Sequence, residues 1–185
     1  EVDTAPDAPP ISIPSEQNRA EEAIVVVDRT HQLFNTVNEL FGRAYPVFAA
    51  EQMLDAIAIM EDQETAVLVA DLDEAGPQAS ALFKLLKQTH PQILTIVVTS
   101  AADSAAIIDL INHAQVFRFA AKPVRPAEFR AQMSAALAQY QAFKAKPRLV
   151  ERHKVEVQPE VRASTLGQGI FDRLRSFKSK LFAKA

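Results

Sequence analysis

Four positions in the sequence combine two carboxylates, a hydroxyl group and an ammonium group, and each follows a short apolar segment. They are Asp28, Asp71, Thr99 with its neighbour Ser100, and Lys122. Carboxylates supply oxygen ligands for divalent cations, and an ammonium group pairs with an anion. Each residue alone has an ordinary explanation, as a turn or cap former or a solvated loop residue. Their recurrence at four such places favours a functional site.

The apolar segments that precede these residues alternate with helical patterns. Short β-branched runs are typical of strands buried on both faces, and apolar residues at intervals of three or four indicate helices. The predicted strands cover 23–28, 46–49, 66–71, 93–99 and 116–120, and the predicted helices cover 31–43, 50–61, 78–89, 103–113 and 126–145. Five strand–helix units predict an α/β fold, a doubly wound five-stranded parallel sheet of the flavodoxin-like type. Ligands of such sheets bind beyond the carboxyl ends of the strands, where the four positions lie.

The near-neutral charge of the 185-residue chain, −3, is the sum of unlike segments. Residues 1–22 hold one basic residue, six acidic residues and four prolines, so we predict a flexible acidic arm. Residues 23–145, with nine basic and thirteen acidic residues, are the predicted domain. Residues 146–166 are predicted to be an extended linker and residues 167–185 a basic amphipathic helix; together they hold ten basic and four acidic residues. The chain begins at Glu1 rather than at Met, and we expect a fragment or a processed product.

The predicted C-terminal helix has one apolar face that we expect to bind a partner. The residues on this face are Ile170, Phe171, Leu174, Phe177, Leu181 and Phe182. Three uses stay open for it: docking on a partner or a second copy, lying on an anionic membrane surface, or packing on its own domain. We favour a protein partner or self-association, because membrane-interface anchors are more often Trp or Tyr than Phe. Nucleic acid is disfavoured, since the tail carries no recognisable reader motif.

Several classes of protein are excluded or disfavoured by what the sequence lacks. It contains no cysteine, which excludes disulfides, zinc–thiolate sites and thiol catalysis. No apolar run approaches the roughly 20 residues of a membrane-spanning helix. There is no glycine-rich phosphate loop after the first strand and no Gly-x-Ser-x-Gly elbow, and the four histidines, interpreted as surface or cap residues, lack metal-ligand spacing. We therefore predict that the protein is not an enzyme, although flavodoxin-like sheets also carry flavin and hydrolase sites.

Residues 23–143 resemble the receiver domains of response regulators, the phosphate-accepting modules of two-component signalling. The resemblance lies in Val25–Asp28, Val69–Asp71, Val97–Ser100 and Phe117–Pro123. The stretch from Ile111 to Phe119 is similar to one branch of the family, whose members often precede a cyclic-dinucleotide phosphodiesterase or another output domain. The resemblance implies a bacterial, cytoplasmic phosphorelay protein with a histidine kinase among its partners.

The resemblance also implies a role for each residue of the metal and acceptor site. Asp71 matches the phosphate acceptor. Asp28, Asp71 and the backbone carbonyl of Asp73 match the Mg²⁺ ligands, with water completing the octahedral shell. Lys122 matches the cation that pairs with the phosphoryl group.

The remaining matched residues concern the switch. The hydroxyl of Thr99 would bond to the phosphoryl group once it has formed, and would draw the aromatic switch position, Phe119, inward. The family usually has a cis peptide bond where this chain has Lys122–Pro123.

This sequence departs from the family pattern at the metal site. Arg29 stands where the family has a second acid, and Glu74–Ala75 replace the usual Met-Pro pair. Two unit charges 4 Å apart interact by about 4 kcal/mol at an effective dielectric constant near 20, so Arg29 weakens the predicted Mg²⁺ site. Phe119 also lacks the hydroxyl of the Tyr found in many active members.

Three functions follow, and the first is preferred. In it the domain is a degenerate receiver that binds protein partners through its tails, with impaired or lost phosphorylation and with Arg29 paired to Asp71. In the second, Asp71 is phosphorylated in a Mg²⁺-dependent manner and controls a separate or missing output domain. In the third, the domain is a structural scaffold subunit of a larger assembly. We expect a cytoplasmic protein, with attachment to a membrane surface through the tail left open.

Overall fold

Five parallel strands form the centre of the structure, a computed structural model that describes residues 20–74, 79–100 and 116–151. The strands pair in the order β2-β1-β3-β4-β5. They are β1 (Ala23–Val27), β2 (Val47–Ala50), β3 (Thr65–Asp71), β4 (Leu94–Thr99) and β5 (Arg118–Ala121). The predicted parallel sheet is confirmed, and each predicted strand lies within two residues of its observed bounds.

The three central strands are buried along their whole length. Every residue of β1, β3 and β4 is buried, whereas the edge strands β2 and β5 are partly exposed. Val and Ile predominate in the central strands, because a strand covered by helices on both faces needs apolar side chains in both directions. Asp71, the last residue of β3, is therefore attached to the most buried part of the sheet.

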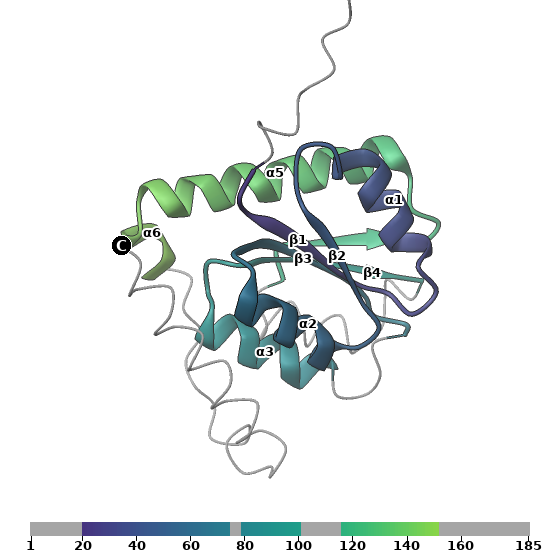
Figure 1. Ribbon diagram of the computed structural model, residues 1–185, viewed down its shortest axis with the longest axis horizontal. Helices are drawn as coiled ribbons and strands as arrows, with labels where there is room; N and C mark the ends of the chain where they lie inside the picture. The colour runs from purple at the N-terminus through teal and green to yellow at the C-terminus, as the bar shows by residue number, and fades with distance from the viewer. Residues whose placement is uncertain (1–19, 75–78, 101–115, 152–185) are drawn as a thin grey trace, which may run out of the picture.

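Helices cover both faces of the sheet. They are α1 (Gln32–Phe41), α2 (Met53–Asp62), α3 (Ala79–Thr89), α5 (Pro126–Ala145) and the short α6 (Arg148–Glu151). Figure 1 shows α1 and α5 on one face and α2 and α3 on the other. Alternate residues of β1 serve the two faces: Val25 and Val27 join the apolar cluster under α2 and α3, while Ile24 and Val26 join the cluster under α1 and α5. This is the predicted doubly wound architecture; the helix predicted over 103–113 lies outside the described residues.

The region after α5 differs from the sequence prediction. Helix α5 has the predicted bounds and begins at Pro126, which lacks only an amide that would be unpaired in the first turn. The prediction of an extended linker from residue 146 is wrong for 148–151, which form α6. Leu149 and Val150 pack against the α1/α5-side cluster, and the burial of this apolar pair accounts for the turn back towards α5. The predicted arm, the rest of the linker and the C-terminal helix lie outside the described residues, except that residues 20–22 are described.

A polar cluster fastens α5 to the amino ends of the strands. This amino-end cluster consists of Glu22, Glu64 and Lys144: the lysine nitrogen lies 2.7 Å from a Glu22 carboxylate oxygen and 3.0 Å from a Glu64 oxygen. Tyr140 donates its hydroxyl to Glu64 at 2.9 Å, and Gln141 donates to Glu22 at 3.3 Å. The donors therefore all come from α5. In the parts of the chain that the structure describes, no helix combines the length and apolar character needed to cross a membrane.

Candidate functional site

The residues singled out at the strand ends meet at one edge of the sheet. Asp28 follows β1, Asp71 and Thr99 end β3 and β4, and Lys122 follows β5. Strand β3 pairs with β1 on one side and with β4 on the other, which brings these ends side by side. The peptide bond between Lys122 and Pro123 is cis, as the resemblance implied. The predicted convergence of these residues is confirmed.

Asp28 caps α1, and both of its carboxylate oxygens are engaged in hydrogen bonds. Its side chain is 1% exposed. One oxygen accepts the backbone N–H and the hydroxyl of Thr30, at 2.9 and 2.8 Å, and the other accepts the backbone N–H groups of Leu33 and Phe34, at 2.6 and 3.1 Å. Burial works against the charge of Asp28, but these hydrogen bonds outweigh it and lower the pKa of the carboxyl. The helix takes its cap from Asp28 because His31, at the N-cap position, has a φ of 59° and makes no side-chain cap bond.

Asp71 pairs with Lys122. The Lys122 nitrogen lies 2.6 Å from Asp71 Oδ2, and the side chain of Asp71 is 5% exposed. The other oxygen of Asp71 accepts the backbone N–H of Asp73 at 3.1 Å. Burial opposes the charge of Lys122, yet its hydrogen bonds to Asp71 and Asp73 and their Coulombic attraction raise the pKa of the ammonium group. The neutralising partner of the candidate acceptor is therefore on β5's side of the site.

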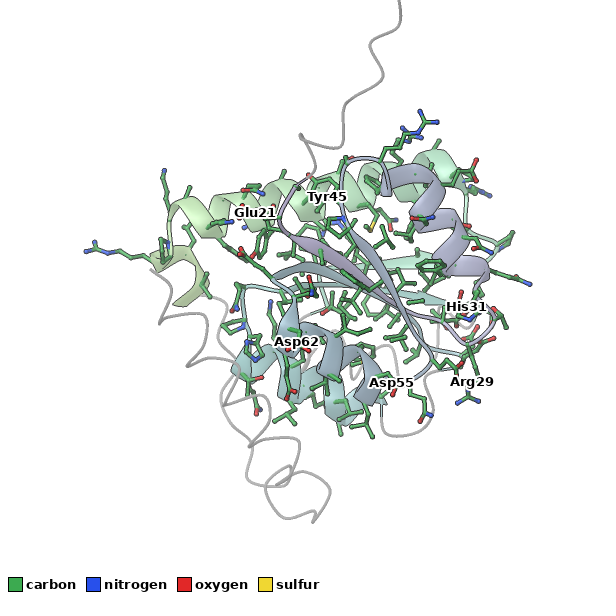
Figure 2. The ribbon with its side chains drawn as sticks, viewed as in Figure 1. Glu21, Arg29, His31, Tyr45, Asp55 and Asp62 are labelled. Atoms are coloured by element: carbon green, nitrogen blue, oxygen red, sulfur yellow. The ribbon has the colours of Figure 1, made fainter. Side chains whose placement is uncertain are left out.

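The pairing of Arg29 with Asp71, which the sequence suggested, is wrong. Arg29 is exposed and lies beside His31 at the edge of the molecule (Figure 2). Among the described residues, the ion pair of Asp71 is with Lys122. Arg29 instead donates its backbone N–H to Glu74 at 3.1 Å, and its side chain is exposed.

Asp73 contributes its side chain, which the sequence analysis did not use. Its carboxylate accepts the Thr99 hydroxyl at 2.8 Å and the Ser100 backbone N–H at 3.0 and 3.3 Å. Lys122 lies 3.1 Å from its second oxygen. Although burial disfavours the charge, the bonds from Thr99, Lys122 and Ser100 hold the pKa of Asp73 at about 2. Asp71, Asp73 and Lys122 are called the carboxyl-end cluster below.

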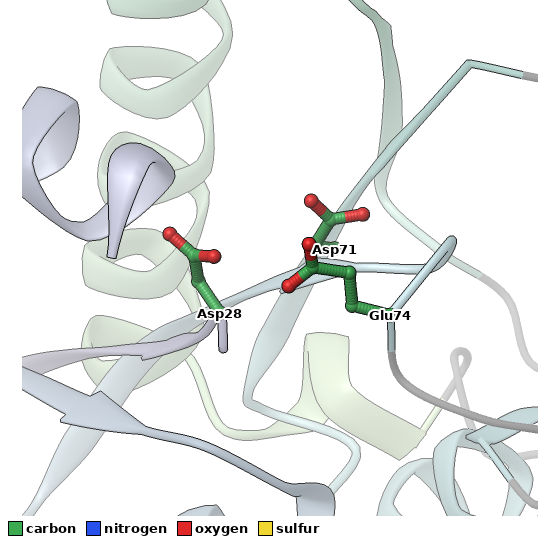
Figure 3. Close-up of side chains that lie close together, drawn as sticks. All are labelled: Asp28, Asp71 and Glu74. Carbon is green, nitrogen blue, oxygen red and sulfur yellow. The ribbon is translucent and has the colours of Figure 1, made fainter. Parts of the chain in front are cut away.

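Glu74 also contributes a carboxylate to the site, a role that was not predicted from the sequence. Oxygens of Asp28, Asp71 and Glu74 lie within 4.8 Å of one another, and Figure 3 shows the Glu74 side chain extending towards the two aspartates. Glu74 also accepts the backbone N–H of Arg29 at 3.1 Å. The signal was present in the sequence, since an acid three residues after Asp71 lies in the turn at the strand end and can reach back over it.

The three carboxylates are ligands of the type that Mg²⁺ prefers, but their oxygens also take part in hydrogen bonds and ion pairs within the protein. Hard oxygen ligands are what Mg²⁺ prefers, and three carboxylates supply them. Both oxygens of Asp28 already accept two hydrogen bonds each. Asp71 is also paired with Lys122 at 2.6 Å, and Glu74 accepts the backbone N–H of Arg29.

The other predicted residues are placed as follows. Phe119, the expected switch residue, lies in β5, is partly buried and packs against the cluster under α2 and α3. His90, interpreted as a surface or cap residue, is buried and follows the last residue of α3, where its backbone N–H donates to the Leu86 carbonyl as a cap residue does. The apolar residues of the C-terminal face lie outside the described residues: Ile170, Phe171, Leu174, Phe177, Leu181 and Phe182.

Comparison with solved structures identifies the fold. A signal receiver domain of an HD domain-containing protein from Pseudomonas fluorescens Pf-5 is 18% identical, with 68% of this chain and 93% of that chain covered and a TM-score of 0.60. A CheY-like response regulator receiver domain protein from Methanospirillum hungatei JF-1 is 21% identical, with coverages of 66% and 98% and a TM-score of 0.59. The chain thus has the fold of response-regulator receiver domains.

The comparisons do not single out one activity. A protein described as an adenylate cyclase from Rhodopirellula baltica is 23% identical, with 71% of this chain and 98% of that chain covered and a TM-score of 0.62. No family model matches the chain, and no curated protein matches it. At these identities the likeness concerns the fold, and the function must be argued from the site.

Proposed function

We propose that the protein is a receiver-fold signalling module of the two-component type that acts through protein contacts, and that phosphorylation of its acceptor, Asp71, is impaired. One observation carries the proposal: the phosphate side of the site is complete, while the metal side is altered. Asp71 has Lys122 at 2.6 Å and Thr99 at the adjoining strand end. On the metal side, Arg29 follows Asp28 where a second acid is expected.

The complete half of the site supports a phosphate-acceptor role for Asp71. In that reaction a carboxylate oxygen of Asp71 attacks the phosphorus of the donor, and the bond from phosphorus to the donor's leaving oxygen breaks. With acetyl phosphate as donor, acetate leaves with the electron pair, and an acyl phosphate remains on Asp71. Lys122 is placed to pair with the transferred phosphoryl oxygens, and the Thr99 hydroxyl to donate to one of them.

The altered half supports impaired phosphorylation. Mg²⁺, when bound, would neutralise charge on the incoming phosphate, and Asp28, Asp71 and Glu74 are the residues that would hold it. Asp28 is committed to the cap of α1, Asp71 is paired with Lys122, and the residue after Asp28 is Arg29 rather than an acid. Weak metal binding leaves the negative charges of Asp71, Asp73 and the phosphate donor opposed, which slows the attack.

The proposed action through protein contacts follows from the impaired phosphorylation. A receiver fold that is rarely phosphorylated influences other proteins by binding them, and a histidine kinase is the expected partner if phosphate transfer is retained. The basic segment 146–185 differs sharply in charge from the acidic domain and is the expected contact region for a protein partner or a second copy. No catalytic turnover is part of this proposal.

Phosphate labelling tests the proposal directly. Wild type, Asp71→Asn and Arg29→Asp would be treated with acetyl phosphate and Mg²⁺ and separated on a phosphate-affinity gel. We expect weak labelling of the wild type, none of Asp71→Asn, and about tenfold faster labelling of Arg29→Asp, because the substitution replaces a cation by a carboxylate beside the metal site. Complete labelling of the wild type with no gain in Arg29→Asp would contradict the proposal.

A second candidate function is favoured by Glu74. If its carboxylate fully replaces the lost acid, the protein is a phosphorylatable, Mg²⁺-dependent response regulator. This alternative requires efficient labelling of the wild type that is lost in Glu74→Gln, with Asp55→Asn, on the exposed side of α2, as the charge-matched control (Figure 2). Weak labelling that Glu74→Gln leaves unchanged would exclude the alternative.

A further inference from the structure

The Asp73 carboxylate is surrounded by hydrogen-bond donors that together form a binding site for an anion. A hydroxyl, a backbone N–H and an ammonium group converge on it from two elements, β4 and the residue after β5. The contacts are Thr99 Oγ1 to Oδ1 at 2.8 Å, Ser100 N to Oδ1 and Oδ2 at 3.3 and 3.0 Å, and Lys122 Nζ to Oδ2 at 3.1 Å. Converging donors of these three kinds are what recognises a phosphate or another oxyanion.

These donors coincide with the groups expected to hold a phosphoryl group on Asp71. Thr99 and Lys122 are the two residues that the resemblance assigns to that group, and both already donate to Asp73. Lys122 bridges the two carboxylates, at 2.6 Å from Asp71 and 3.1 Å from Asp73. A phosphoryl group joined to Asp71 would therefore need the same donors.

We propose that the side chain of Asp73 is an internal ligand that occupies the position of the phosphoryl group and keeps Thr99 and Lys122 in the phosphate-bound arrangement. This inference rests on the proposed function and names the regulation of the same site. An aspartate two residues beyond Asp71 can reach this position because the chain turns at the end of β3, where the N–H of Asp73 is bonded to Asp71.

The state of the switch residue agrees with this inference. The resemblance predicts that Phe119 moves inward when the Thr99 hydroxyl turns towards a phosphoryl group. The Thr99 hydroxyl is bonded to Asp73, and Phe119 is partly buried against the α2/α3-side cluster that includes Val97. The domain thus holds one arrangement without phosphate.

The inference can be tested without relying on phosphorylation, by using inorganic phosphate as the probe. Asp71→Asn removes the acceptor and its charge, and the double variant Asp71→Asn/Asp73→Ala also empties the anion site. The backbone amide signals of Thr99 and Ser100 in ¹⁵N NMR spectra report on the site directly. We expect the Ser100 amide signal to move upfield in the double variant, because its N–H loses a charged acceptor.

Titration with inorganic phosphate then distinguishes an emptied site from an occupied one. In the double variant the Ser100 and Thr99 amides should respond to phosphate with an apparent Kd at least about tenfold lower than in Asp71→Asn alone, the factor expected for one charge-assisted hydrogen bond gained. Asp71→Asn/Asp55→Asn carries the same charge as the double variant and should behave like Asp71→Asn. Asp71→Asn/Asp73→Ser, whose shorter side chain leaves the anion site open, serves if the alanine variant does not fold.

Two results would overturn the inference. The first is a Ser100 amide that stays in place when Asp73 is replaced, since the carboxylate would not be its acceptor in solution. The second is a displaced amide that does not respond to phosphate, since the emptied site would not be one that binds phosphate. Neither result bears on the proposed function, which is judged by labelling of Asp71 in the otherwise unchanged protein.

Discussion

The two ends of the sheet each hold a lysine between two carboxylates, with nearly the same distances. In the carboxyl-end cluster Lys122 lies 2.6 Å from Asp71 and 3.1 Å from Asp73; in the amino-end cluster Lys144 lies 2.7 Å from Glu22 and 3.0 Å from Glu64. The pattern of charges is therefore shared. The origin of the other donors differs.

At the amino end the further donors are side chains of α5, and the two acids come from segments 42 residues apart in the chain, Glu22 and Glu64. Such a cluster joins a helix to a sheet. At the carboxyl end the two acids are two residues apart, and the further donors are a hydroxyl and a backbone N–H at the end of β4. A lysine between two acids therefore does not by itself distinguish the two clusters, whereas the hydroxyl and backbone N–H donors at the end of β4 do.

The largest expected effect is the loss of Asp28, the acid at the carboxyl edge with a structural role. Asp28→Ala should reduce the free energy of unfolding by about 2 kcal/mol, because a cap is lost and buried N–H groups of α1 lose their acceptor. Urea denaturation followed by circular dichroism measures it. Asp28→Asn, which keeps one acceptor oxygen, should lose less. An alanine variant as stable as the wild type would show that α1 does not depend on this cap.

A smaller effect is expected from Lys144→Met. This variant tests whether the amino-end cluster and the carboxyl-end cluster are independent of each other. Loss of Lys144 leaves Glu22, whose side chain is 9% exposed, with Gln141 as its remaining side-chain donor, and should cost about 1 kcal/mol after solvent screening at the partly exposed lysine. The amide signals of Thr99 and Ser100 should not move. Lys122→Met should move both signals. If Lys144→Met also moved them, the two ends of the sheet would be coupled and the comparison would fail.

The smallest effect concerns acid pH. The folded-state pKa of Asp73 is about 2, below its usual value of 3.8, and that of Glu22 is also lowered, because bonds from Lys144 and Gln141 outweigh the penalty of burial. Both groups stabilise the fold fully above their unfolded pKa values, and this contribution is lost as the pH falls through the folded values. Asp73→Asn should therefore reduce the loss of stability between pH 4 and pH 2 by about 1 kcal/mol, measured by thermal unfolding. An unchanged slope in this variant would contradict the assigned bonds.

The fold could be predicted from the sequence because its signals are local and repeated. The β-branched runs of β1, β3 and β4 and the helical periodicity between them leave few arrangements other than a parallel sheet covered on both faces. That architecture alone brings Asp28, Asp71, Thr99 and Lys122 to one edge. The convergence of these residues was thus a consequence of topology.

The details of the site could not be predicted in the same way, because they depend on which of several candidate side chains contacts a given partner. Arg29 and Lys122 are both cations near Asp71 in the sequence pattern, and only the path of the chain after each strand decides between them. Asp73 was expected to contribute its carbonyl, and nothing in its spacing specifies the direction of the carboxylate. Leu149 and Val150 form a pair too short to show helical periodicity, so α6 was not predicted.

The burial of β3 has a consequence for how this domain can respond to any signal. All seven residues from Thr65 to Asp71 are buried, and the strand is hydrogen-bonded on both sides, so its amides should exchange with solvent mainly through global unfolding. We therefore expect Asp71, the last residue of this strand, to stay in place. Adaptation to a ligand therefore has to occur in what surrounds it, at the end of β4 and along the edge strand β5 with Phe119.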